Sequence, residues 1–181
     1  RLAQRIVGEV GAKLAAPQSG DEQRYCILLG GDIVYGMGHD APRAERSTGQ
    51  MVKGSDVDLV VITRDQASKE LSQALDEGIF MEKYRHLNNP AFKEEIDYVV
   101  KPMERVREQV AFDTFKHMVS CKILREAVLI YGSEELHSEV TALLQVRRIP
   151  ERLAELEAQA VEARYRAQET LLEIEDTRLV G

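Results

Sequence analysis

The chain has 181 residues and a formal net charge of −7, from 24 Lys and Arg against 31 Asp and Glu. This length suits one compact domain, or one domain with a long helical extension. Hydrophobic residues at 44% and charged residues at 30% exclude a disordered chain. No apolar run approaches the ~20 residues of a membrane-spanning helix. The excess of acidic residues argues against a broad face that binds a nucleic-acid duplex.

The start of the chain and its two cysteines bear on its compartment. Charged and polar residues stand where the apolar stretch of a secretory signal would begin, and the chain starts at Arg1 without an initiator Met, which is compatible with a piece of a longer protein. Cys26 and Cys121 lie in apolar contexts without metal-ligand spacing, so we expect reduced, buried thiols. These features predict a cytoplasmic protein without membrane contact.

Hydrophobic spacing and turn residues predict alternating helices and strands. In chain order these are a helix over 2–15, a strand over 25–29, a long loop over 37–54, a strand over 57–63 and a helix over 66–87. They are followed by a strand over 96–101, helical segments across 103–126 with a break near Phe112, a strand over 127–131 and a helix over 134–146.

The tail from Pro150 onward is rich in Glu, Ala, Arg and Leu and predicts one helix of ~27 residues. Alanines at several seam positions make a weak coiled coil, so we expect a helix that packs on its own domain or connects to another element. The predicted fold is α/β: a small mixed sheet flanked by helices, with a long C-terminal helix. Residues 1–148 would form the domain and residues 149–181 the extension.

Two carboxylates at the start of the strand over 57–63 require an explanation. Asp56 and Asp58 are two residues apart, so both project from the same face of an extended chain. Carboxylates side by side repel each other and raise each other's pKa unless a cation lies between them. Magnesium prefers carboxylate oxygens together with substrate phosphates, so the pair is a candidate metal site.

Two further features strengthen that interpretation. The strand over 25–29 ends in Gly30 and Gly31, whose missing side chains would let a phosphate approach the backbone. Asp97 lies within the apolar strand over 96–101, where a charge is costly to bury unless it is paired or binds a metal. Three acids on two strands beside a glycine turn are typical of two-metal phosphoryl or nucleotidyl transfer.

This pattern resembles the nucleotidyltransferase superfamily, which includes DNA polymerase beta, the aminoglycoside nucleotidyltransferases and the minimal nucleotidyltransferases of bacterial toxin–antitoxin pairs. The chain is most similar to the minimal type, over residues 1–135. The resemblance implies nucleotide contacts at Gly30, Gly31 and Ser55. It also implies that Asp56, Asp58 and Asp97 are the catalytic and metal-binding residues for two Mg²⁺ ions and an NTP, with Asp97 as a candidate base.

The chain departs from the family pattern in two places. Gly31 stands where many members carry Ser, and residues 37–53 lengthen the interval before Asp56 by more than ten residues. This insertion is either a lid or a specificity loop. Five basic residues are candidates for phosphate contacts, although ordinary surface charges are the more common case: Arg43, Arg46, Lys53, Lys116 and Lys122.

The leading hypothesis is a Mg²⁺-dependent nucleotidyltransferase that moves an NMP from an NTP to a hydroxyl and releases pyrophosphate. The acceptor stays open between a protein side chain, a small molecule and an RNA end. The alternative is a non-catalytic module of the same fold that binds nucleotide, or that binds a partner or a second copy through the C-terminal helix.

Overall fold

The structure is a computed structural model that describes residues 21–37, 41–45, 48–52, 54, 56–67, 69–89 and 95–179. The helix predicted over residues 2–15 lies outside this part of the chain. Within it, no helix combines the length and the apolar character that crossing a bilayer requires.

The predicted α/β architecture is confirmed, with a mixed sheet in strand order β5–β4–β1–β6. Its strands are β1 (Tyr25–Gly30), β4 (Val57–Thr63), β5 (Ile96–Pro102) and β6 (Val128–Gly132). Strand β1 pairs antiparallel with β4 and β6, whereas β4 and β5 run parallel. All four strands coincide with the apolar runs of the sequence to within a residue.

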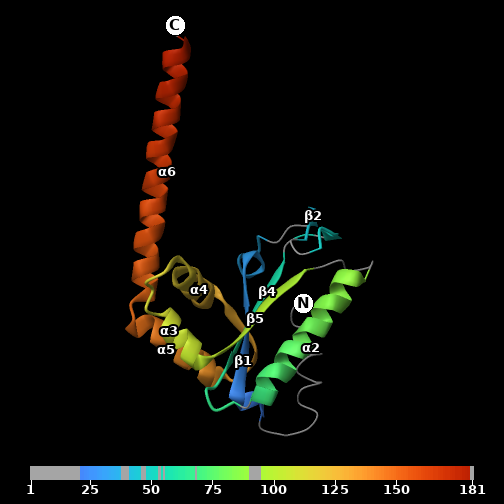
Figure 1. Cartoon of the computed structure of the whole chain (residues 1–181). Coiled ribbons are helices and arrows are strands. Elements are labelled where there is room, and N and C mark those ends of the chain that lie inside the picture. The colour runs from blue at the N-terminus through green and yellow to red at the C-terminus, as the bar shows by residue number, and fades with distance from the viewer. Residues whose placement is uncertain are drawn as a thin grey trace.

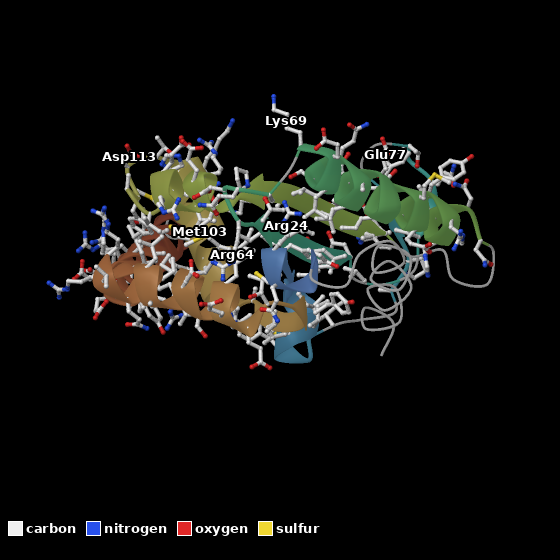
Figure 2. All side chains as sticks on the ribbon, turned by 90° about the horizontal axis from the view of Figure 1, so that it is seen from below. Arg24, Arg64, Lys69, Glu77, Met103 and Asp113 are labelled. Carbon is white, nitrogen blue, oxygen red and sulfur yellow. The ribbon has the colours of Figure 1, made fainter. Side chains whose placement is uncertain are left out.

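Helices cover both faces of the sheet, with α2 on one side and α3, α4 and α5 on the other (Figure 1). The helices are α2 (Lys69–Asn88), α3 (Met103–Gln109), α4 (Phe115–Glu126), α5 (Glu134–Val146) and α6 (Ile149–Leu179). Two short 3-10 helices, η1 (Asp21–Arg24) and η2 (Asp32–Tyr35), flank β1. Figure 2 shows the three layers from below the view of Figure 1, with Arg24 and Arg64 labelled.

The sheet separates two apolar cores because successive side chains of a strand point to opposite faces. Val57, Leu59 and Val61 pack in the core beneath α2. Val60 and Ile62 pack in the other core, with α3, α4 and α5. Burial on both faces explains why β4 reads as a nearly continuous apolar run, and it fixes the position of the charged residues at the start of the strand.

The predicted break near Phe112 is confirmed as the turn between α3 and α4. Phe112 has a φ of 57°, which is unusual for a bulky residue, and its ring is buried. The Arg152 guanidinium lies 4.4 Å from the centre of this ring. Thr114 then caps α4 by accepting a hydrogen bond from the His117 backbone N–H.

The segment predicted as a long loop over 37–54 has more regular structure than expected. It contains a two-stranded hairpin of β2 (Arg43–Ala44) and β3 (Met51–Val52). The turn is closed by the buried carboxylate of Glu45, whose Oε2 accepts hydrogen bonds from the backbone and the hydroxyl of Thr48, both at 2.6 Å. Loss of hydrophobic periodicity did not distinguish such a short, polar hairpin from a loop.

Helix α6 has 31 residues and projects away from the body of the protein (Figure 1). Ile149 and Leu153 are buried among the other helices, whereas every residue from 154 to 171 is exposed. The predicted helix is therefore present, and only its first turns pack on the domain. The division at residues 148 and 149 stays a prediction.

We predict that truncation after Ala154 changes the free energy of unfolding by less than about 1 kcal/mol, because residues 155–171 are exposed and the surface ion pair between Lys122 and Glu157 contributes little. Leu153→Ala, which empties a buried position, should cost about 2–4 kcal/mol. Urea unfolding followed by circular dichroism measures both. A large loss on truncation would show that the projecting helix stabilises the domain.

Candidate active site

Three carboxylates meet at the end of the sheet where β4 and β5 begin. In the parallel register of these strands Asp58 lies directly beside Asp97, and Asp56 immediately precedes β4. One carboxylate oxygen from each residue lies within 4.8 Å of the other two, and all three residues are partly buried. The structure thus brings together the three acids that the sequence singled out.

The glycine turn lies on the other side of Asp58. Gly30 pairs with Asp58 across β1 and β4, and Gly31 follows with a φ of 74°. A Cβ atom at Gly31 would lie 2.0 Å from the Asp58 Oδ2 atom. Glycine is therefore required here twice, by the backbone conformation and by the closeness of the carboxylate.

Burial and neighbouring negative charges both disfavour the charged form of Asp58. Burial raises its pKa to about 6, and the negative charges of Asp56, Asp97, Asp32 and Glu95 act in the same direction. The folded protein therefore holds the Asp58 carboxylate in surroundings that disfavour its charged form. A divalent cation between the three carboxylates would relieve this repulsion.

Basic side chains reach the edge of the cluster from two other elements. Lys83 of α2 donates a hydrogen bond to Asp97 Oδ1 at 3.0 Å. Arg43 of β2 pairs with Asp56 at 3.6 Å and with Glu95 at 2.7 Å. These contacts join the hairpin and α2 to the two strands that carry the acids.

Arg43 and Glu95 add two findings to the sequence analysis. Arg43, a candidate phosphate contact, is the ion-pair partner of two acids and donates through Nε to the Gly54 carbonyl at 2.9 Å, and its contact with phosphate stays a prediction. Glu95 was not singled out at all, yet its side chain is 3% exposed. Its only signal in the sequence was its place directly before a predicted strand.

The remaining predicted contacts are placed as follows. Lys122 forms surface ion pairs with Glu126 and Glu157, and Lys116 is exposed on the same helix. Ser55, Arg46 and Lys53 lie outside the described residues, so their roles stay predictions. Both cysteines are buried free thiols, as expected.

Comparisons with known proteins give no family assignment. No family model matches the chain, and no curated protein matches it significantly. Among solved structures, it is similar to a toxin–antitoxin with AMP-PNP, at 15% identity, 86% coverage of this chain, 94% of the other and a TM-score of 0.38. A mutant of the toxin–antitoxin MntA–HpeT gives 12% identity, 84% and 92% coverage and a TM-score of 0.36. Both TM-scores are below 0.5, so these similarities assign no role to the residues of the site.

The raised pKa of Asp58 predicts how stability depends on pH without divalent cations. Because the folded pKa of about 6 lies above the ordinary value of 3.8, the protonated carboxyl favours folding. The free energy of unfolding should therefore fall by about 1–2 kcal/mol as pH rises from 4 through 6, after discounting for solvent screening. Asp58→Asn should remove this fall in urea titrations with EDTA, whereas the exposed Glu155→Gln should keep it. Parallel profiles for Asp58→Asn and the wild type would contradict the prediction.

The glycine turn offers a matched pair of variants. Gly31→Ala should lower the free energy of unfolding by about 1–3 kcal/mol more than Gly36→Ala. Both positions have a positive φ, of 74° and 67°, but a Cβ at Gly36 meets nothing within 4 Å. Thermal or urea unfolding measures the difference. Equal losses would mean that backbone strain alone, and not the approach of Asp58, requires Gly31.

Proposed function

We propose that this protein is a Mg²⁺-dependent nucleotidyltransferase that moves an NMP from an NTP to a hydroxyl acceptor and releases pyrophosphate. The observation that carries this proposal is the cluster of Asp56, Asp58 and Asp97, with one oxygen of each within 4.8 Å of the others. Structural ion-pair networks do not need three acids in this arrangement, and Asp58 has no basic partner in the described part of the chain.

The donor set fits Mg²⁺. All three side chains offer hard carboxylate oxygens, and their repulsion is the feature that a bound dication would compensate. Asp56, Asp58 and Asp97 would hold the metal. When bound, divalent cations neutralise charge on the triphosphate and lower the pKa of the attacking hydroxyl.

The surrounding residues define where each reactant would lie. Gly30 and Gly31 place a backbone without side chains against the β1 side of Asp58, and the triphosphate would lie along this backbone. Asp97 lies on the β5 side, where it would receive the proton of the acceptor hydroxyl. Attack forms a bond between the acceptor oxygen and the α-phosphorus as the bond to pyrophosphate breaks, and these two oxygens lie roughly in line.

A non-catalytic role is the second candidate, and the projecting helix is the observation that favours it. Leu156, Val161, Tyr165 and Leu171 are exposed on α6, which is unusual for a helix without a partner. In that case the helix would bind a protein, and the domain would bind nucleotide without turnover. Removing α6 would abolish partner binding and leave nucleotide chemistry unchanged.

Turnover with labelled nucleotides tests the proposal. The protein is mixed with each of four α-labelled NTPs and cell lysate, with Mg²⁺ or EDTA, and label is sought on protein, RNA and small molecules. We predict transfer only with metal, and a loss of at least 10³-fold in the Asp56→Asn/Asp58→Asn variant. Glu155→Gln, which removes an exposed carboxylate from α6, is the matched control and should keep full activity.

The double variant should stay folded, since it removes like charges, and circular dichroism checks this. Equal transfer by the double variant and the wild type would overturn the proposal. Nucleotide binding without transfer in any fraction would favour the non-catalytic candidate, and the Mg²⁺ dependence of the melting temperature would then show whether the acids bind metal at all.

A further inference from the structure

Lys101 of β5 is a buried cation without an acidic partner. Its side chain is 7% exposed, and its Nζ donates one hydrogen bond, to Gln109 Oε1 at 2.7 Å. Among the residues that the structure describes, no carboxylate forms an ion pair with it, and the titratable groups that act on it are the Cys121 thiol and the Arg105 guanidinium. Burial lowers its pKa to about 8, so the ammonium form still predominates at neutral pH. An ammonium has three donors, and buried charges are normally paired.

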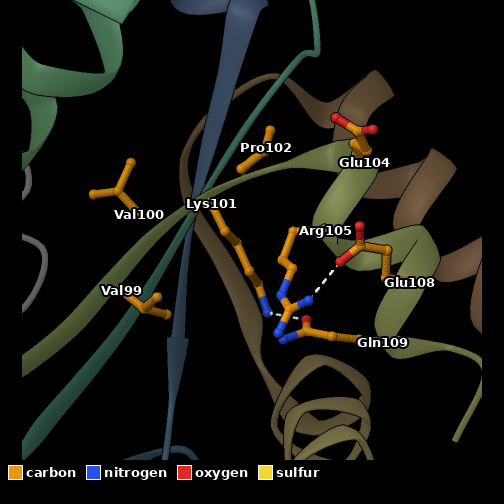
Figure 3. A pocket seen from close by; sticks show the side chains of 8 residues that line it. All are labelled: Val99, Val100, Lys101, Pro102, Glu104, Arg105, Glu108 and Gln109. Atoms are coloured by element: carbon orange, nitrogen blue, oxygen red, sulfur yellow. Dashed lines mark hydrogen bonds and ion pairs between the residues drawn. The ribbon is translucent and has the colours of Figure 1, made fainter.

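Lys101 borders an open cleft of about 510 Å³ between β5 and α3. Figure 3 shows the side chains of Lys101 and Arg105 pointing into the same space beside Gln109. Arg105 pairs with Glu108, but both side chains are about half exposed, so this ion pair is weak and the guanidinium keeps other donors available. Glu104 also lines the cleft, so its four charged side chains sum to zero without a ligand.

This cleft adjoins a second one that is lined by two of the three carboxylates. A second cleft, of about 260 Å³, is lined by Asp58, Val60, Asp97 and Ile123, and Val99 belongs to both clefts. Asp97, Val99 and Lys101 lie on one face of β5, since they are two residues apart, and the run from Asp97 to Lys101 is about 13 Å at 3.3 Å per residue. The two clefts meet at Val99, and a groove that joins them, here called the β5 groove, would run from Asp97 over this apolar residue to Lys101.

The strand order indicates which reactant would occupy this groove. Gly31 lies on the β1 side of Asp58, and β5 lies on the opposite side, in the order β5–β4–β1. Entering and leaving groups occupy opposite sides of the reacting phosphorus. With the triphosphate at the glycine turn, the β5 groove is the acceptor side.

We propose that the β5 groove binds an acceptor that carries a phosphate group, with the phosphate on Lys101 and Arg105 and the hydroxyl at Asp97. The placement of the hydroxyl rests on the proposed nucleotidyl transfer, whereas the anion site stands on Lys101 itself. A phosphate has enough oxygens to accept from an ammonium and a guanidinium together, which a single carboxylate does less well. A small phosphorylated molecule and the last nucleotide of an RNA share this chemistry.

A structural role for Lys101 makes a different prediction. Strand β5 is at the edge of the described sheet, and a charged residue that points inward discourages edge-to-edge pairing. In that case Lys101→Met would promote association of the protein and leave anion binding unchanged. The two roles therefore separate on one variant.

Inorganic phosphate is the first probe. Its binding is measured by NMR of protein labelled with ¹³C at the lysine ε-carbon. We expect saturable binding at millimolar phosphate that moves the Lys101 resonance and raises its pKa. Lys101→Met should weaken binding at least tenfold, Lys101→Arg should retain it, and Lys69→Met, which removes an exposed lysine outside the cleft, should leave it unchanged. No shift up to 50 mM phosphate, or equal binding by Lys101→Met, would overturn the proposal.

Three further probes separate the sources of the phosphate. A nucleoside 5′-monophosphate that binds as tightly as a short RNA with a free 3′ hydroxyl indicates a small acceptor, and tighter binding of the RNA by tenfold or more indicates an RNA end. Preference for a phosphate-free acidic peptide over both would overturn the proposal. The Asp56→Asn/Asp58→Asn variant should lose turnover and still bind phosphate. In the wild type, phosphate binding without turnover counts against nucleotidyl transfer alone, whereas turnover without phosphate binding counts against this site alone.

Discussion

Three carboxylates that repel one another are held together at one end of the sheet, and much of the surrounding structure serves to keep them there. Asp58 and Asp97 are neighbours because β4 and β5 pair in parallel register. That register is fixed because β4 buries apolar side chains on both faces. A register shift of one residue would turn the side chains of each face toward the opposite core. Burial of hydrophobic surface thus offsets the electrostatic cost of the cluster.

Basic side chains pair with Asp56 and Asp97, whereas Asp58 has no basic partner among the described residues. Lys83 pairs with Asp97, and Arg43 pairs with Asp56 and Glu95. Asp58 lies close to both other acids, and burial together with their charges raises its pKa to about 6. A cation beside Asp58 would relieve this repulsion, which agrees with the proposed metal-dependent transfer.

The two sides of Asp58 differ in a way that suits a reaction between two substrates. On the β1 side, Gly31 leaves no room for a side chain near the carboxylate. On the β5 side, an apolar groove passes Val99 and ends at Lys101, whose charge has no acidic partner among the described residues. The first side offers backbone without side chains, and the second offers a cleft and positive charge. The proposed donor and acceptor sites follow from this asymmetry.

The sequence by itself determined the strands, the break near Phe112 and the acids of the site, because buried runs, turn residues and isolated charges in apolar strands are local features of the chain. Only the tertiary structure decided which charges meet. Arg43 and Glu95 are 52 residues apart and pair because the hairpin folds back onto the start of β5. Likewise, Lys101 reads as the polar end of a strand in the sequence, and only the packing of α3 against the edge of the sheet makes it a buried charge without an acid. Contacts of this kind depend on register and packing, which no local pattern encodes.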